Sequence, residues 1–325
     1  MQTIISNKTL VFKQPAGTSR GVYRVRHVQY VELVDENDPS LRGVGECAPL
    51  PNLSKDGSAM AFAFETALLQ YERRSKILYD TPFTRGEVGV PINGLIWMGT
   101  YEEMKARIED KLRQGFRCVK LKIGAINFDD EVSLLRMIRS RFPREVIELR
   151  VDANGAFMPG DDAMRKLDTL ARLDLHSIEQ PIRQGQWDEM AALCRNTPLP
   201  IALDEELIGM STMASGTYDV PTREYKQALL DTIRPQYIIL KPSLHGGLSG
   251  SREWIQLAHE RGIGSWITSA LESNVGLNAI AQFASDVYGP EVSMPQGLGT
   301  GQLFEENVEG YPIYLKGDEM WVRQD

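Results

Sequence analysis

From about residue 90 the sequence alternates short apolar runs with longer amphipathic segments, and this rhythm constrains the fold more than any other feature. The apolar runs have the length of buried strands and span residues 91–97, 118–123, 147–151, 175–178, 200–203, 237–240 and 265–268. Between two of them Met104, Ile108 and Leu112 recur every four residues, as on one face of a helix. Seven or eight strand–helix units over ~205 residues predict a parallel (β/α) barrel, with a doubly wound open sheet as the alternative.

The first ~90 residues follow a different pattern. Residues 22–34 alternate apolar and polar side chains, which predicts an antiparallel strand with one solvated face. A turn-rich stretch at residues 37–40 and a helical segment at residues 59–71 follow, so this part reads as a small α+β domain. Residues 311–322 have the pattern of a hairpin that could return to it.

Charge and composition exclude several classes of protein. The 36 basic and 44 acidic residues give a net charge of −8, which argues against a general nucleic-acid binder. The amino-terminal residues do not resemble a signal peptide, and no apolar run approaches the ~18 residues of a membrane span. Cys47, Cys118 and Cys194 are far apart and odd in number, so neither a disulfide framework nor a zinc knuckle is indicated. We expect a cytoplasmic protein, and the sequence leaves its oligomeric state open.

Charged residues stand at the carboxyl ends of the predicted strands, where barrel enzymes carry their catalytic groups. From the second strand to the seventh, these ends read Lys120-Leu121-Lys122, Asp152-Ala153-Asn154-Gly155, Glu179-Gln180-Pro181, Asp204-Glu205-Glu206, Lys241-Pro242-Ser243 and Ser269-Ala270-Leu271-Glu272. Parallel strands of a barrel end at one mouth, so these groups are expected to converge there.

Three of the converging groups are carboxylates, on Asp152, Glu179 and Asp204. Carboxylates brought together in a partly dry site repel one another strongly unless a cation neutralises them. Oxygen ligands suit a hard cation, so the sequence predicts Mg²⁺, with Mn²⁺ as the alternative. The four histidines are scattered along the chain, which argues against zinc.

Lysines accompany these acids. Lys120 and Lys122 are two residues apart on a predicted strand, so both side chains point to the same face. Neighbouring ammonium groups disfavour each other's charge, which favours a role as a base. Lys241 would approach from nearly the opposite side of the barrel. A substrate carboxylate held on the metal between these lysines is the arrangement needed to remove a proton from the adjacent carbon.

Taken singly, each feature has a simpler interpretation. A Lys-x-Lys pair is usually solvated, and an aspartate after a strand is often a helix cap. Glu205 and Glu206 could be ordinary surface acids, and Glu46 could pair within the first domain. We interpret the histidines as structural except His245. The hypothesis of a metal-dependent active site rests on the whole set of lysines and acids in strand order rather than on any single residue.

The order Lys-x-Lys, Asp-x-Asn, Glu-Gln-Pro, Asp-Glu, Lys-Pro and Ser-Ala-Leu-Glu-Ser resembles the muconate-lactonizing subgroup of the enolase superfamily. Four stretches resemble the subgroup members that eliminate water from a cyclohexadiene carboxylate: residues 45–51, 241–247, 268–273 and 297–304. The resemblance implies a (β/α)7β TIM-like barrel at residues 93–299. It also implies an α+β capping domain of residues 1–92, to which residues from about 300 to 325 return.

The resemblance also implies a role for each site residue. Lys122 would take the α-proton and then help water leave, while Lys241 would stabilise negative charge from the other face. Lys120 would keep Lys122 basic and aligned, and Arg150 would neutralise the acidic cluster, with Asn154 and Glu205 in support. The substrate would be held by Ser269, Gly299 and Thr300, and by Asn52 and Ser54 of a loop that closes over the mouth.

Four residues depart from the family pattern, namely Asn52, Leu53, Asn274 and Gln296. They lie on the predicted lid and rim, so they bear on substrate preference. The nearest alternative on the same scaffold is an N-acylamino acid racemase or a dipeptide epimerase. Dipeptide epimerases typically have Asp-x-Asp after the seventh strand, where this chain has Ser269-Ala270-Leu271. A barrel that binds a small acid without turnover is less consistent with the complete set of lysines and acids.

Overall fold

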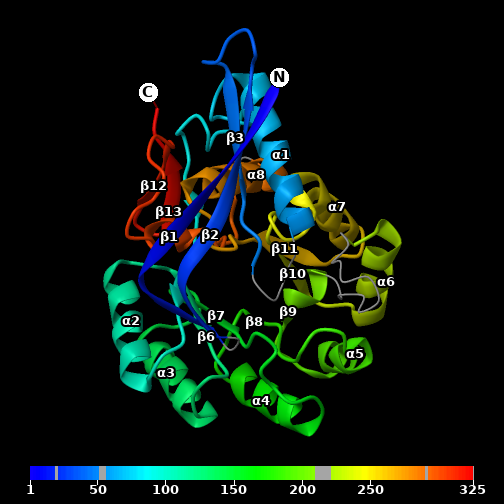
Figure 1. Cartoon of the computed structure of the whole chain (residues 1–325). Helices are drawn as coiled ribbons and strands as arrows, with labels where there is room; N and C mark the ends of the chain where they lie inside the picture. Colours follow the sequence, from blue (N-terminus) through cyan, green and yellow to red (C-terminus); the bar gives the residue numbers. More distant parts are fainter. Residues whose placement is uncertain (19–20, 51–55, 209–220, 290–291, 325) are drawn as a thin grey trace.

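Figure 1 shows the computed structural model of the chain, which describes residues 1–18, 21–50, 56–208, 221–289 and 292–324. A barrel of parallel strands ringed by helices forms the larger part. The amino-terminal strands and the first helix stand at one end of this barrel, beside the helices α7 and α8 (Figure 1).

The barrel sheet joins seven parallel strands of the described chain in the order β11-β10-β9-β8-β7-β6-β5. These strands are β5 (Gly94–Ile96), β6 (Cys118–Lys122), β7 (Glu148–Asp152), β8 (Ser177–Glu179), β9 (Ile201–Leu203), β10 (Tyr237–Leu240) and β11 (Gly264–Ile267). Parallel bridges from Gln296 to Ile92 and from Gly297 to Thr268 join the two edges of the sheet. The predicted (β/α)7β barrel is therefore confirmed, and the open doubly wound sheet is wrong.

Helices follow the barrel strands in the predicted alternation. They are α2 (Tyr101–Arg113), α3 (Phe128–Arg141), α4 (Asp161–Ala171), α5 (Trp187–Asn196), α6 (Arg223–Ile233), α7 (Gly247–His259) and α8 (Asn274–Tyr288), with 3-10 helices η1 (Glu205–Ile208) and η2 (Gly299–Gln302). Helix α2 begins at a capping box, in which Thr100 and Glu103 each accept a hydrogen bond from the other's backbone N–H. None of the helices in the described ranges is long and apolar enough to span a membrane.

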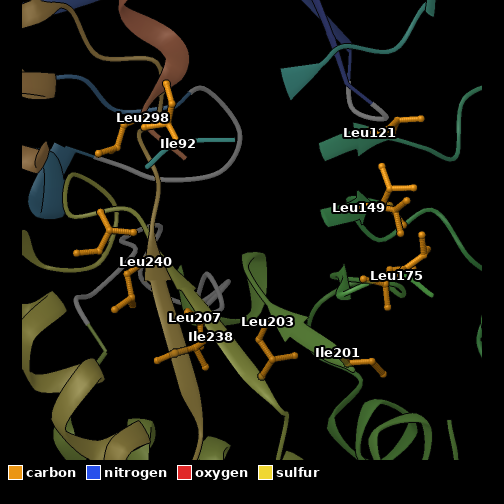
Figure 2. Close-up of a cluster of buried hydrophobic side chains, with 14 of the residues drawn as sticks. Ile92, Leu121, Leu149, Leu175, Ile201, Leu203, Leu207, Ile238, Leu240 and Leu298 are labelled. Atoms are coloured by element: carbon orange, nitrogen blue, oxygen red, sulfur yellow. The ribbon is translucent and has the colours of Figure 1, made fainter. Parts of the chain in front are cut away.

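The period of two along a strand separates the core from the site. In β6, Val119 and Leu121 belong to the main hydrophobic core, together with Met104 and Ile108 of α2. Figure 2 shows that successive barrel strands supply this core with Leu121, Leu149, Ile201, Leu203, Ile238 and Leu240. Lys120 and Lys122, which alternate with these core residues, line a pocket at the carboxyl ends of the strands.

The amino-terminal part forms a separate antiparallel sheet. Its strands β1 (Gln2–Thr18), β2 (Gly21–Val34) and β3 (Arg42–Cys47) lie in chain order, and α1 (Asp56–Arg73) packs against β3. A third sheet has the order β12-β13-β4, from β4 (Val90–Pro91), β12 (Ile313–Lys316) and β13 (Glu319–Val322).

Two details differ from the sequence pattern. The apolar run at residues 91–97 divides, because β4 pairs antiparallel with β13 while β5 enters the barrel. The hairpin predicted at residues 311–322 is present, and it pairs with β4 rather than with the β1-β2-β3 sheet. The carboxyl-terminal segment contacts that sheet before the hairpin, through a bridge between Phe304 and Phe12. The division into a capping domain and a barrel near residues 92 and 300 stays a prediction.

Candidate active site

Three carboxylates, which we call the acidic trio, meet at the carboxyl ends of neighbouring barrel strands. Asp152 ends β7, Glu179 ends β8, and Asp204 directly follows β9. Asp152 and Glu179 are direct partners in the parallel register. One ligand atom from each of the three lies within 4.8 Å of the others, and all three side chains are buried. The predicted convergence of these acids is therefore present in the fold.

Three lysines flank the acidic trio in strand order. Lys120 and Lys122 come from β6 on one side, and Lys241 follows β10 on the other. Their ammonium nitrogens lie 2.7 Å from Glu179 Oε2, 2.6 Å from Asp152 Oδ2 and 2.5 Å from Asp204 Oδ1, respectively. Each lysine therefore has a different carboxylate as its nearest acceptor, and Lys120 also donates to Asp152 Oδ2 at 3.4 Å.

Burial and neighbouring charges both shift the pKa values of the side chains in this cluster. Burial raises the pKa of Glu179 well above its usual value, and the charge of Asp152 raises it further. Burial would lower the pKa of Lys120, but Glu179 and Asp152 outweigh it, so the pKa of Lys120 is raised. The expectation that a neighbouring lysine lowers the pKa is wrong for Lys120, because two carboxylates accept hydrogen bonds from its ammonium group.

The acidic trio fits a hard divalent cation. Its ligands are all carboxylate oxygens, the donors that such ions prefer. Among the described residues, Glu179 Oε1 is buried without a hydrogen-bond partner. A buried carboxylate oxygen in that state is costly unless something positive binds it. The site can therefore hold a divalent metal through Asp152, Glu179 and Asp204.

A polar layer supports Lys122. Asn154, in the left-handed region at φ 45°, accepts a hydrogen bond from Lys122 Nζ at 2.9 Å and donates one to Glu205 Oε1 at 3.0 Å. Glu205 and Glu206 are buried in η1, so their interpretation as surface acids is wrong. Glu206 instead accepts a hydrogen bond from the backbone of Gly185 at 2.8 Å.

A pocket of about 770 Å³ of empty volume, part of it open to solvent, is lined by the three lysines and by Glu179 of the acidic trio. The predicted substrate-binding residues Ser269, Gly299 and Thr300 line it, and the hydroxyls of Ser269 and Thr300 are hydrogen-bonded to each other. Asn52 and Ser54 lie outside the described residues. The fold thus gathers the described members of the predicted substrate-binding set around one cavity.

Sequence reasoning missed other residues of the pocket wall. Asn93, Leu95 and Trp97 line the pocket, and their spacing of two along the first barrel segment is a signal that could have indicated them. Tyr23 also lines the pocket, although it comes from β2 of the amino-terminal sheet. No local pattern marks Tyr23, because its place depends on how that sheet sits on the barrel.

Arg150 does not have its predicted partners. Its guanidinium donates to Glu148 Oε1 at 2.7 Å and to the Pro295 carbonyl at 2.9 Å, and it stacks over Trp266. Glu148 begins β7, whereas Asp152 ends it. The prediction that Arg150 neutralises the acidic trio is therefore wrong, because its charge is used at the opposite end of the strand.

Replacing Arg150 with Met tests this correction. We expect a loss of roughly 3 kcal/mol of unfolding free energy, because the change leaves Glu148 without its buried partner. The affinity for a divalent cation should stay within about twofold, since no contact to the trio is removed. Urea unfolding and titration calorimetry measure the two quantities. A large fall in cation affinity of the folded variant would restore the original prediction.

Two of the residues that depart from the family pattern, Gln296 and Asn274, make hydrogen bonds that support the fold. Gln296 accepts a hydrogen bond from the Ile267 backbone at 2.7 Å, so its side chain supports the segment that closes the barrel. Asn274 donates to the Val308 carbonyl at 3.0 Å and ties α8 to the carboxyl-terminal segment. Neither residue lines the pocket described above. Asn52 and Leu53 lie outside the described residues.

Glu46 joins the amino-terminal sheet to the barrel. Its fully buried carboxylate accepts hydrogen bonds from Ser273 N and Gly276 N, both at 2.9 Å, at the start of α8. A carboxylate at a helix amino terminus is favourable because it meets free N–H groups and the positive end of the helix dipole. The interpretation that Glu46 pairs within the first domain is therefore wrong.

A pH-dependent stability is expected from Glu46. Burial raises the pKa of Glu46 to about 7. As pH rises through 4.5 and then 7, the unfolded chain loses this proton before the folded chain does, so folding stability falls. Glu46→Gln cannot titrate, so its stability relative to the parent should rise by roughly 2.5 kcal/mol between pH 5 and pH 8. Denaturant unfolding at both pH values measures this, and a pH-independent difference would contradict it.

Comparison with known proteins agrees with the fold and with the site. Residues 103–309 match the model of the enolase C-terminal domain-like family. The chain is 44% identical to the o-succinylbenzoate synthase of Desulfotalea psychrophila over 95% of each chain. The crystal structure of MenC from Desulfotalea psychrophila superposes with a TM-score of 0.82 at 40% identity, over 99% of both chains.

A second group of relatives shares the fold at lower identity. The L-Ala-D/L-Glu epimerase of Bacillus subtilis is 28% identical over 57% of this chain and 47% of its own length. The structure of that epimerase has a TM-score of 0.81 at 18% identity, covering 99% of this chain and 96% of its own. The match to the synthase is longer and has higher identity than the match to the epimerase, so it assigns the chain to the first group. The chain belongs to the enolase superfamily and, within it, to the family that contains the o-succinylbenzoate synthase of Desulfotalea psychrophila.

Proposed function

We propose that this protein is an o-succinylbenzoate synthase, a lyase that removes water from a succinyl-bearing hydroxycyclohexadiene carboxylate (SHCHC) in menaquinone biosynthesis. The observation that carries the proposal is the 44% identity to a protein of that name over 95% of both chains. The lysines on both flanks of the acidic trio support it, because α-proton removal needs a base and a group that stabilises negative charge.

We infer that the acidic trio binds Mg²⁺, with Mn²⁺ as the alternative, because both ions accept octahedral oxygen ligands. The bound ion would supply positive charge to the substrate carboxylate and so make the neighbouring C–H more acidic. Three buried cysteines without disulfides are consistent with the cytoplasmic location that we expect.

In the proposed reaction Lys122, as the neutral amine, takes the proton from the carbon beside the substrate carboxylate. The electron pair of that C–H bond forms the new ring double bond while the C–O bond to the hydroxyl breaks. Lys122 then returns its proton to the departing hydroxyl, so water leaves from the same face. Lys241, on the other flank, stabilises negative charge, and Asn154 orients Lys122 through their 2.9 Å hydrogen bond.

The pocket wall suits a substrate with a second polar end. We propose that Ser269 and Thr300, with the backbone at Gly299, hold the succinyl group, because their hydroxyls and N–H groups can donate to a carboxylate. Leu95, Trp97 and their neighbours would cover the ring, as apolar side chains do in most small-molecule sites. Asn52 and Ser54 would close over the mouth and exclude water.

A direct assay tests the proposed function. Purified protein with Mg²⁺ is expected to convert the cyclohexadiene acid to o-succinylbenzoate, and EDTA should stop the reaction until Mg²⁺ is restored. N-Acyl amino acids and dipeptides are incubated in D₂O in parallel, and α-deuterium incorporation is followed by NMR. Turnover of one of these compounds, with the diene acid left unchanged, would replace the proposal by a racemase or an epimerase.

A further inference from the structure

The turn from Ser269 to Ser273 forms one wall of the pocket in a strained conformation. Ser269, Ala270 and Leu271 all line the pocket. Leu271 has φ 68°, a left-handed backbone conformation that a branched side chain rarely adopts. Such a conformation persists only when the surrounding structure holds it in place, and it occurs mainly at ligand sites.

Two fully buried side chains of the amino-terminal sheet hold this turn. Arg26 of β2 donates to the Ala270 carbonyl at 3.2 Å, on one side of Leu271. Glu46 of β3 accepts hydrogen bonds from Ser273 N at 2.9 Å and Ser273 Oγ at 2.6 Å, on the other side. The strained residue therefore lies between two fixed points that both come from a different sheet.

Arg26 also reaches a second wall of the same pocket. Its guanidinium donates to the carbonyls of Ala48 and Pro49, and the next residue, Leu50, also lines the pocket. Neither Arg26 nor Glu46 lines the pocket. The buried Arg26 guanidinium interacts electrostatically with Glu46 and with the buried Glu272. Arg26 therefore connects two segments of the pocket lining, and Glu46 fixes the far end of the turn, although neither side chain lines the pocket.

We propose that Arg26 and Glu46 are positioning residues for substrate binding: they hold the Ser269–Ser273 turn in its left-handed form, so that Ser269 and Leu271 complete the pocket. The inference deepens the proposed function, on which it rests for the identity of the substrate. It assigns specificity for the far end of the substrate to contacts made by the amino-terminal sheet. The lysines and the acidic trio make no part of these contacts, so proton transfer should be affected little.

Arg26→Met and Glu46→Gln test the proposal, with Arg42→Met as the control, because Arg42 lies on β3 but pairs with Glu32 instead. Amide hydrogen exchange at residues 270–273 should become about tenfold faster in both test variants, as expected from the loss of a charge-assisted hydrogen bond. KM for the diene acid should rise by a similar factor while kcat stays within about threefold, because only binding is affected. Arg42→Met should change neither quantity.

Leu271→Gly provides a second variant in case Arg26→Met does not fold. Glycine adopts positive φ without strain, so this variant should fold. Its amide hydrogens at residues 270–273 should exchange faster and its KM should rise. Unchanged exchange at residues 270–273, or equal loss of kcat and kcat/KM with KM unaltered, would overturn the proposal. If the parent left the diene acid unchanged while exchange still accelerated, the proposed function would fail and the holding of the turn would stand.

Discussion

Lys122→Ala is expected to lower kcat by about 10³-fold, the usual contribution of a positioned general base. Lys122 is the member of the β6 pair that contacts both Asp152 and Asn154, and it lines the pocket. Removing it deletes the proposed base and leaves the acidic trio in place. Turnover of the diene acid and deuterium washout at its α-carbon should fall together, because both need the same proton transfer.

Two further variants make this result specific. Lys122→Arg keeps the positive charge but cannot act as a base near neutral pH, so it should be as inactive as Lys122→Ala. Lys166→Ala is the matched control, since Lys166 is a partly buried lysine that pairs with Asp162 away from the pocket. Circular dichroism verifies folding of each variant. Parent-like turnover by Lys122→Ala would remove Lys122 from the mechanism.

Glu179→Gln is expected to weaken divalent-cation binding by at least about 100-fold, more than changes of residues behind a ligand usually do. Glu179 lies on the central strand of the three that carry the trio, and its Oε1 has no hydrogen-bond partner among the described residues. The amide keeps the size of the side chain but supplies only a neutral oxygen. Activity at fixed Mg²⁺ should be lost with the metal.

Thermal unfolding provides a readout that does not depend on turnover. Saturating Mg²⁺ should stabilise the parent, by roughly 2.7 kcal/mol when the ion is present at 100 times its Kd. The same concentration should leave Glu179→Gln nearly unchanged. Glu272→Gln serves as the control, because Glu272 is a buried carboxylate that accepts from Ser243 outside the trio. Equal stabilisation of all three proteins would remove Glu179 from the metal site.

The sequence predicted those parts of the site in which local periodicity alone decides where a side chain points. Lys120 and Lys122 share a face because a strand has a period of two. Asp152 and Glu179 converge because parallel strands end at one edge. The departures arose where a partner is distant in sequence. The family resemblance assigned Arg150 to the acidic trio, but its guanidinium is held by the distant Pro295 carbonyl and the Trp266 ring, and it pairs with Glu148.

The sequence by itself determined the alternation of strands and helices and the order of charged groups at the strand ends, because those features follow from short-range patterns repeated along the chain. Only the tertiary structure decided which carboxylate each lysine meets, how Gln296 and Gly297 close the ring, and that Glu46 caps a helix in the barrel. Those contacts join segments separated by up to 230 residues. Their free energy depends on how distant segments pack together, and no local periodicity records that packing.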